Sequence, residues 1–531
     1  MKRTILLLLS FAAALWVSGQ TPGTLDTSFG NQGITLIDWH GDNNSAEAIR
    51  LLPDGGMLLC GNNGYLGSAN NCSVVKLLAD GLPDPAFGAD GKIEFDYGGD
   101  HDFVYDMAIL PDNKFIVCGG SISGNNASIA LAKFTETGLP DPSFGNNGIA
   151  VHHFSDFEFA FSILLLDNGR FAVAGYIDQP DGDRDLLVCR FLSNGALDPA
   201  FGTNGKFMAD LQNSSSDFPR GMALHNGKIL ICAYAFNGNS DNYDAIALVR
   251  LTTAGVFDVS FGIGGKSIND GFDFDGGLLM EAGTSLAIDY QNRIVVSATS
   301  RGIAGDYATL LRFQSNGYPD NSFGDYGTEV YLEPGDVALR AVAVQPDGKI
   351  LAAGRKRNGS AESMLLMRVL ENGALDPQFG AFNGYAVFGI STGTYLWDMA
   401  NAMAITPGQK AILAGRSYTP ETSGDFTALC VHLGNIVDVD APEPDKNPFI
   451  FPNPVVNNTL QLNQMPANGP LNKIIIYDAS GREIAVYHLS NNQPDAHHPT
   501  VHLPEHLPAG IYVLKTRDCH QQQVSLTFIK P

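Results

Sequence analysis

The sequence repeats one motif seven times, and this recurrence limits the fold more than any other feature does. The motif reads Gly-x-x-Asp-x-x-Phe-Gly, and its copies centre on Phe29, Phe87, Phe144, Phe201, Phe261, Phe323 and Phe379. Successive phenylalanines are 58, 57, 57, 60, 62 and 56 residues apart. A nearly fixed period of this length indicates structural units that bury part of their surface against their neighbours.

Each unit is predicted to contain four short β-strands. In the second unit we expect these strands at residues 91–95, 104–110, 114–118 and 128–134, with a Pro-Asp-Asn turn joining the middle two. Four strands in each of seven units predict an all-β fold, a seven-bladed β-propeller over residues 23–434. An open solenoid is the competing architecture, but the sequence lacks the atypical polar caps that a solenoid needs.

A basic residue in the last strand of each unit precedes the aspartate of the next motif by eight positions. The six pairs are Lys76 and Asp84, Lys133 and Asp141, Arg190 and Asp198, Arg250 and Asp258, Arg312 and Asp320, and Arg368 and Asp376. A constant offset predicts one repeated ion pair or an aspartate-capped turn. The alternative is a set of bases that lines a ligand channel. Because an acid accompanies nearly every base, we favour the structural interpretation.

Two residues of this pattern lack a partner at that offset: Asp26 begins the series and His432 ends it. We interpret them as the two halves of one broken unit. The N-terminal strand near residues 33–38 is therefore expected to complete the blade that holds residues 426–433. This closure would leave no exposed sheet edge in the ring. The motif phenylalanines are expected to pack between neighbouring blades.

The motif copies, such as Gly-Ala-Leu-Asp-Pro-Ala-Phe-Gly at residues 195–202, resemble those of the delta-60 repeat family. The resemblance covers residues 23–434 and recurs seven times. It implies a propeller-like fold and no defined activity.

The first residues, 1–19, are predicted to be a signal peptide rather than part of the fold. Lys2 and Arg3 precede an apolar stretch over residues 5–17, and small residues follow it. This stretch is too short for a transmembrane helix, and no later segment is long and apolar enough. We therefore expect a secreted or surface protein without a transmembrane segment.

After the repeats, an acidic linker with regularly spaced prolines is expected at residues 435–449. Residues 450–531 then predict a small β-sandwich of immunoglobulin-like type. This segment resembles the type A sorting domain of the type IX secretion system of Bacteroidota. The motif residues that carry the resemblance are Pro452, Asn453, Pro454, Asp478, Gly481, Arg482, Gly510 and Tyr512.

This second resemblance implies passage through the periplasm and export across the outer membrane, with the type IX machinery as a partner. The protein would then be released or held at the outer-membrane surface. An ordinary accessory sandwich domain is the alternative interpretation of residues 450–531.

Charge and motif content narrow the possible functions. The net charge of −24, from 32 basic and 56 acidic residues, disfavours nucleic acid as a partner. No convincing catalytic, cofactor-binding or metal-binding set is found. One Gly-x-Ser-x-Gly match, residues 389–393, lies in an all-β context rather than between a strand and a helix. The aspartate-rich loops 181–185 and 270–277 are compatible with Ca²⁺ binding, although each is more simply explained as a turn.

The seven cysteines do not predict a disulfide framework, because their number is odd and their density is low. A bridge between Cys60 and Cys72 across one hairpin remains an open alternative. Blades four and five depart most from the repeat, so their loops beside the central channel are the expected place for a ligand. We expect a non-enzymatic scaffold that binds a glycan or a protein; the alternative is a propeller enzyme acting on extracellular polysaccharide.

Overall fold

The computed structural model divides the chain into two compact units, residues 1–435 and 436–531. The first unit is described for residues 21–434 except 40–42, 65–69, 181, 213–215, 237–244, 270–279, 303–304, 332–334, 393–395 and 420–421. In the second unit, seven strands are described. The predicted signal peptide, linker residues 435–448, Gly481 and Arg482 lie outside the described residues.

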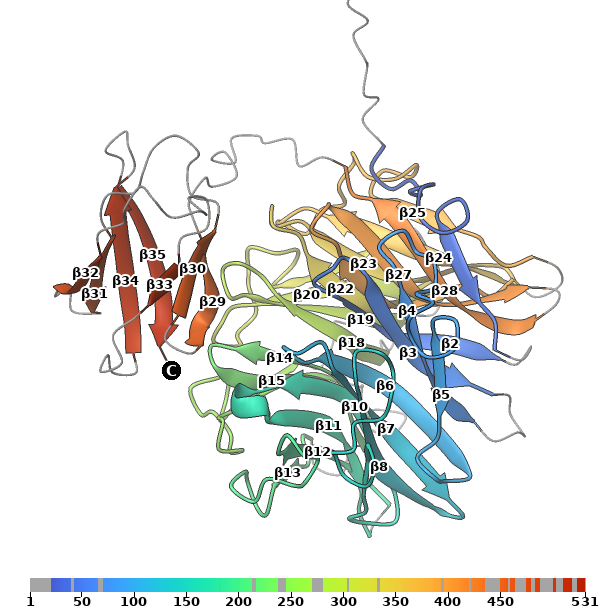
Figure 1. Ribbon diagram of the computed structural model, residues 1–531. Coiled ribbons are helices and arrows are strands. Elements are labelled where there is room, and N and C mark those ends of the chain that lie inside the picture. Colours follow the sequence, from blue (N-terminus) through green and yellow to red (C-terminus); the bar gives the residue numbers. More distant parts are fainter. Residues whose placement is uncertain are drawn as a thin grey trace, which may run out of the picture. The chain divides into compact units, whose positions relative to one another are not determined.

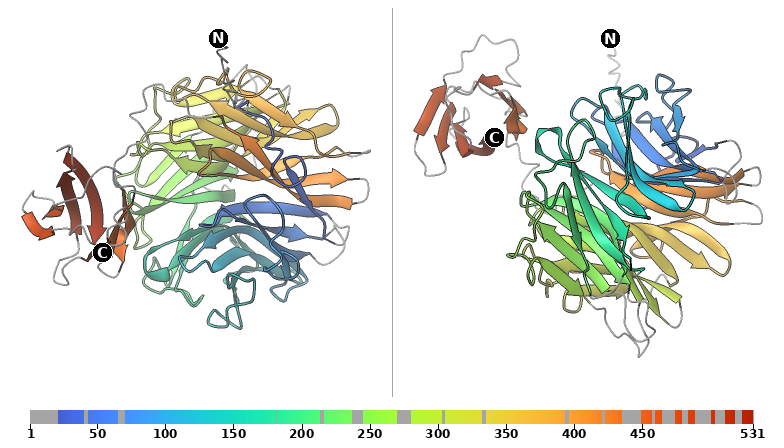
Figure 2. Two further views of the ribbon diagram at one scale, coloured as in Figure 1. Left: turned by 45° about the horizontal axis from the view of Figure 1, so that its top comes forward. Right: turned by 90° about the horizontal axis from the view of Figure 1, so that it is seen from below.

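The first unit is a seven-bladed propeller, and each blade is a four-stranded antiparallel sheet. The innermost strands are β2 (Asn44–Leu51), β6 (His101–Ile109), β10 (Glu158–Leu165), β14 (Ser216–His225), β18 (Met280–Ile288), β22 (Val337–Val344) and β26 (Met399–Ile405). Each contacts the innermost strands of both neighbouring blades, β2 with β26 included. The blades therefore follow one another around a closed ring (Figure 2), which confirms the predicted fold class.

The remaining strands continue each sheet outward. The second strands are β3 (Met57–Asn63), β7 (Phe115–Ser123), β11 (Phe171–Asp178), β15 (Lys228–Phe236), β19 (Ile294–Gly302), β23 (Ile350–Asn358) and β27 (Lys410–Thr419). The third strands are β4 (Asn71–Leu77), β8 (Asn126–Phe134), β12 (Arg184–Phe191), β16 (Ala245–Leu251), β20 (Gly305–Phe313), β24 (Ala361–Val369) and β28 (Thr422–His432). The outer strands are β5 (Lys92–Phe95), β9 (Ile149–His152), β13 (Lys206–Ala209), β17 (Lys266–Asn269), β21 (Thr328–Tyr331), β25 (Tyr385–Phe388) and β1 (Ile34–Ile37).

The prediction that residues 91–95 open the second unit is wrong. These residues form β5, which pairs with β4 and is the outer strand of blade one. The motif turn reverses the chain, so the next segment folds back on the strand before it; the Lys76 amide donates a hydrogen bond to Gly91 O at 2.9 Å. The expected fourth strand at residues 128–134 is accordingly the third strand, β8, of blade two.

The predicted ring closure is confirmed. Strand β1 pairs antiparallel with β28, from Ile34 opposite Leu429 to Ile37 opposite Phe426. Asp26 N donates to Cys430 O at 2.8 Å, which extends the contact toward the N-terminus. In Figure 1 the blue N-terminal strand accordingly lies beside the orange strands of blade seven. Blade seven is therefore built from both ends of the repeat region.

The motif phenylalanines pack between blades, as expected. Each is buried, and in all but the last copy its ring lies under the first motif glycine of the next unit. At Gly81, φ is +82°, and an added Cβ would lie 2.7 Å from the ring of Phe29. Gly317 stands in the same relation to Phe261. A side chain at these positions would be strained by the positive φ and would also collide with the ring.

The second unit contains two antiparallel sheets. One holds β29 (Phe449–Val456), β30 (Thr459–Asn463) and β33 (Thr500–His502). The other holds β32 (Glu483–Tyr487), β31 (Ile474–Asp478), β34 (Gly510–Arg517) and β35 (Gln523–Lys530). The sheets contact each other through β29 and β35. The described residues of the whole chain contain no helix that is long and apolar enough to cross a membrane.

The described cysteines are free thiols and are buried. In the hairpin of β3 and β4, Cys60 lies opposite Val74 and Cys72 lies opposite Asn62, so the two thiols are not paired. Burial raises the pKa of both thiols well above the usual value. These cysteines are therefore core residues of low reactivity.

Removing residues 21–38 should destabilise the ring, because β28 would become an exposed edge and Asp26 would be lost. We expect a lower midpoint of thermal unfolding by circular dichroism and aggregation on size-exclusion chromatography. Deletion of residues 436–531 is the control, since it leaves every strand of the ring paired. Equal midpoints for the two truncated proteins would contradict the closure argument.

Candidate functional site

The structure brings every predicted acid–base pair together. The nitrogen–oxygen distances are 2.9 Å for Lys76 and Asp84, 3.4 Å for Lys133 and Asp141, 2.9 Å for Arg190 and Asp198, 2.7 Å for Arg250 and Asp258, 2.7 Å for Arg312 and Asp320, and 2.8 Å for Arg368 and Asp376. His432 Nε2 lies 3.6 Å from Asp26 Oδ1 and supplies the seventh pair. The residues left over at the two ends of the sequence pattern are thus partners in space.

These pairs join a turn, an aromatic ring and the next blade. Asp258 Oδ1 accepts hydrogen bonds from the backbone amide and the hydroxyl of Ser260, which fixes the turn. The Arg250 guanidinium lies 4.5 Å from the centre of the Phe261 ring. Its Nη1 also donates to Ser315 O in the turn of the next unit, at 2.8 Å. Because these contacts use most of the donors of Arg250, little of its binding capacity is left for a ligand.

A second cation reaches most of these aspartates, and the sequence analysis missed it. This residue follows the hairpin turn between the first and second strands, where Pro-Asp-Asn-Lys at residues 111–114 and Pro-Asp-Gly-Lys at residues 346–349 were a usable signal. The contacts are Lys114 with Asp141, Arg170 with Asp198, Lys228 with Asp258, Arg293 with Asp320, Lys349 with Asp376, and Lys410 with Asp26. Burial alone would raise the pKa of Asp26, but hydrogen bonds from Lys410 and Ser28 lower it to about 2.

The depressed pKa of Asp26 predicts a loss of stability in acid. The stabilising charge is fully present above the unfolded pKa of 3.8 and is lost as the pH falls toward 2. Asp26→Asn should therefore lower the free energy of unfolding by about 2 kcal/mol at pH 7. Urea titrations should show this difference shrinking between pH 4 and pH 2. Asp112→Asn, at an exposed hairpin position, should change nothing measurable; an Asp26→Asn effect equal at pH 7 and pH 2 would contradict the assignment.

Each innermost strand carries one β-bulge at an equivalent position. The bulged residues, which we call the axial ring, are Glu47, Tyr105, Phe161, Arg220, Thr284, Arg340 and Asn401. A bulge leaves one residue outside the ladder and redirects its side chain. The bulges lie in the half of each strand away from the hairpins and motif turns. The axial ring is therefore separate from the ion pairs between blades.

Charged side chains from several blades act on one another at the axis. Burial raises the pKa of Glu47, whereas a hydrogen bond with Ser45 and the charges of Arg340, Arg416 and Arg220 act in the opposite direction. Glu47 belongs to blade one, whereas Arg220 belongs to blade four and Arg340 to blade six. Because these blades are not neighbours, their side chains can interact only across the propeller axis. Arg416, on the second strand of blade seven, joins the same group.

One side of the axial ring is aromatic and the other is rich in arginine. On the aromatic side the ring centroids are separated by 4.8 Å for Tyr105 and Phe161, 5.7 Å for Phe161 and Tyr176, 5.5 Å for Tyr176 and Phe218, and 5.0 Å for Phe218 and Tyr234. Arg220 marks the boundary, because its guanidinium lies 5.2 Å from Phe161 and 5.4 Å from Tyr234. Arg340 is exposed and the other six members are half-buried, so solvent reaches the group.

The Gly-x-Ser-x-Gly match has a structural role. Ser391 Oγ donates a hydrogen bond to Asp398, and the same carboxylate accepts from Ile390 N at 2.8 Å. Tyr418 N donates to Ser391 Oγ at 2.8 Å, which ties the loop to the second strand of blade seven. The hydroxyl is held between the Asp398 carboxylate and a backbone amide rather than by a histidine or a lysine, so it serves to fix the loop and is not arranged as a nucleophile.

Neither aspartate-rich loop provides a described calcium site. Residue 181 and the whole of 270–277 lie outside the described residues. Among the side chains that the structure does describe, no three of His, Cys, Asp or Glu converge as metal ligands. Of the loops in blades four and five, where a ligand was expected beside the central channel, residues 237–244 and 270–279 also lie outside the described residues.

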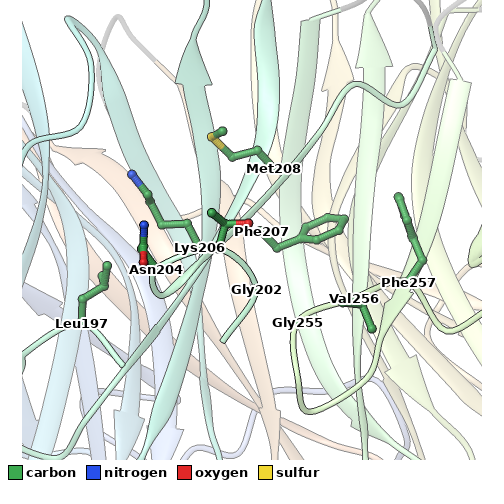
Figure 3. Close-up of a pocket in the computed structure, with 10 residues that line it drawn as sticks. Leu197, Gly202, Asn204, Lys206, Phe207, Met208, Gly255, Val256 and Phe257 are labelled. Carbon is green, nitrogen blue, oxygen red and sulfur yellow. The ribbon is translucent and has the colours of Figure 1, made fainter. Parts of the chain in front are cut away.

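A pocket of about 590 Å³ lies between blades three and four (Figure 3). Phe207 and Phe257 meet edge to face across it, with centroids 5.0 Å apart. Lys206 is the one charged residue among those that line it, and its ammonium group lies 4.3 Å from the Phe154 ring. Because no set of polar groups converges there, we interpret this pocket as a seam between repeated turns.

Four stretches of the chain match a family model described as a domain of unknown function (DUF5122) beta-propeller: residues 110–144, 167–201, 225–261 and 345–379. Each stretch runs from the hairpin turn of one unit to its motif phenylalanine. The repeats therefore match a propeller family whose description assigns no activity. No curated protein matches the sequence.

Several solved structures have a similar chain path at very low sequence identity. A polysaccharide lyase of family PL25, an ulvan lyase, is 9% identical with a TM-score of 0.43, covering 75% of this chain and 96% of its own. The polysaccharide lyase Uly1 is 10% identical with a TM-score of 0.43 (79% and 94% covered). An α-L-arabinanase of Penicillium chrysogenum is 9% identical with a TM-score of 0.37 (78% and 99% covered). Similarities of this size do not transfer an activity.

Proposed function

We propose that this protein is an extracellular binding propeller that holds a glycan chain at the axial ring. The observation that carries this proposal is the pairing of an aromatic wall with arginines at one solvent-accessible place on the axis. Aromatic faces pack against the C–H faces of sugar rings, and guanidinium groups donate several hydrogen bonds in a fixed plane. Convergent polar groups beside apolar walls are typical of ligand sites.

Binding is favoured over hydrolysis because the axial ring has too few acids. Most glycoside hydrolases use two carboxyl groups on either side of the scissile bond. Glu47 is the single acid among the seven bulged residues. Burial raises the pKa of Tyr105, and the charge of Glu47 raises it further, so its hydroxyl stays protonated and is not available as a base. The ring thus has one acid and no matched partner for it.

A propeller enzyme acting on extracellular polysaccharide is the second candidate, and one observation favours it. Burial raises the pKa of Glu47, which moves this carboxyl toward the protonated state that a general acid needs. Incubation with polysaccharides would then release reducing ends, or unsaturated products if the reaction is an elimination. Glu47→Gln would abolish that release. If no polysaccharide that binds yields a product, the enzyme is ruled out and binding is the remaining function.

For localisation, we propose that residues 450–531 act as a type IX sorting domain and that residues 1–19 direct the chain to the periplasm. Released protein and protein held at the outer-membrane surface are both compatible with this route. The motif segments are adjacent in the second unit, where Asp478 in β31 lies opposite Tyr512 in β34. Pro452, Asn453 and Pro454 lie in β29, and Gly510 begins β34.

Replacing an aromatic residue of the axial ring should weaken glycan binding. We expect Phe161→Ala to lower the affinity for any glycan found on an array by about tenfold, since a stacking face is lost. Isothermal titration calorimetry measures the change. Phe207→Ala is the matched control, because Phe207 is also half-buried but lines the seam between blades three and four. Equal affinities for the two variants would place the binding site elsewhere.

Removing the last two strands should block export. In a Bacteroidota host with a type IX system, the chain without residues 510–531 should accumulate in the periplasm, whereas the full chain should reach the surface or the medium. Immunoblots of the cell fractions give the measurement. Export of the shortened chain at the level of the full chain would reject the sorting role.

A further inference from the structure

We propose that the axial ring selects acidic glycans, chains whose sugars carry carboxylate or sulfate groups, over neutral ones. This inference rests on the proposed glycan-binding function and names the class of glycan. It follows from the number, pairing and placement of the arginines around the propeller axis.

The axial group has a local excess of positive charge on an acidic protein. The charges of Arg220, Arg355 and Arg416 act on Arg340, and Arg220, Arg340 and Arg416 all act on the carboxylate of Glu47. The whole chain carries a net charge of −24. An acidic polymer is therefore repelled by most of the surface, and any affinity for it must come from a concentrated cationic place. Three arginines facing one carboxylate provide such a place.

The arginines at the axis differ from nearby arginines that are already neutralised. Arg355, on the second strand of blade six, lies 3.2 Å from Asp306 and 3.3 Å from Glu362. Arg340 and Arg416 have no such ion pair among the described residues, and Arg220 Nη2 donates to the neutral hydroxyl of Tyr234 at 3.3 Å. Their charges are available for an anion from solution.

Arg416 has a donor that an anionic oxygen would satisfy. Its Nε is buried and has no hydrogen-bond partner among the described residues, which is also true of Arg355 Nη1. A buried donor without a partner is costly, and a charged oxygen is the strongest acceptor that would relieve the cost. The guanidinium of Arg416 lies 6.0 Å from the Tyr418 ring, so an aromatic face is again close to the unpaired cation.

The surroundings strengthen any anion contact at the axis. Partial burial lowers the pKa of Arg340, and the charge of Arg220 lowers it further, so these two cations lie near each other at a place that solvent still reaches. Charge interactions are stronger there than at an open surface. The aromatic wall adjoins the arginines at Arg220, so a sugar ring stacked on Phe161 would have its acidic substituent beside a guanidinium. A neutral sugar would gain the stacking but lose the charge contact.

The test compares acidic chains with neutral forms of the same backbone. Binding of the full-length protein would be measured by calorimetry with polygalacturonate and its methyl ester, and with chondroitin sulfate and desulfated, carboxyl-esterified chondroitin. We expect at least one acidic form to bind about tenfold or more tightly than its neutral form, and higher salt to weaken this binding. Comparing the two pairs distinguishes carboxylate from sulfate recognition, and selectivity in either supports the inference.

Substitution of Arg340 links the selectivity to the axial ring. Because Arg340 is exposed, Arg340→Met should fold normally and lower the affinity for the acidic form about tenfold, a larger loss than for the neutral form, which loses a hydrogen-bond donor but no charge contact. Arg340→Lys should retain part of the acidic affinity, since it keeps the charge without the planar fork. Arg301→Met is the control, because Arg301 is exposed and paired with Asp306; it should bind like the unchanged protein.

The outcomes separate this inference from the function on which it rests. Equal affinity for acidic and neutral forms, with no effect of Arg340→Met, would overturn the selectivity and leave the glycan-binding function standing. Binding to no glycan at all, on an array that includes acidic chains, would overturn both.

Discussion

A buried ion pair at each blade position is the interaction on which the rest of the propeller depends. In the fourth blade, Asp258 fixes its own turn through Ser260, and Arg250 reaches from that aspartate to a carbonyl oxygen in the next unit. A buried pair of this kind is weak evidence for high stability, because desolvation offsets much of the attraction. What it provides is geometry, since Arg250 cannot shift without losing its aspartate and its contact with the next unit together. Repeated around the ring, the pair fixes the position of each blade on the one before it.

This arrangement separates the part of each blade that must stay constant from the part that is free to vary. The motif turn, its phenylalanine and the glycine above that ring occupy one end of the blade, and nearly every unit repeats them. The bulges lie toward the other end of the innermost strands, and there the seven positions carry six residue types. Every blade repeats the bulge in its backbone, whereas the side chain at the bulge is not repeated from blade to blade. A symmetric scaffold can thus carry an asymmetric group of acid, aromatic and cationic residues on its axis.

The sequence made the ring and its closure predictable because the repeat spacing and the unpaired Asp26 and His432 are visible without a structure. The strand order was assigned one strand out of step, because nothing in the spacing shows whether residues after the motif turn fold forward or back onto β4. The axial ring was missed for another reason: its members share a position and not a residue type. A usable signal was the second-strand glycine, as at Gly175, where an added Cβ would lie 1.6 Å from Phe159 O. This glycine marks the close approach beside the bulge at Phe161. Counting back from it would have found five of the seven positions, since blades four and five have Ala233 and Ala298 in its place.

The closing strand also has a consequence for how the protein folds. Ile34 is paired with Leu429, so the first strand of the ring has its partner almost at the end of the repeat region. Contacts between residues so distant in sequence form slowly, because the intervening chain must be ordered first. During synthesis, blades one to six have their strands in order, while the strand that completes blade seven is made first and paired last. A truncated or unfinished chain then leaves blade seven incomplete, so the ring closes only when the whole repeat array has been made.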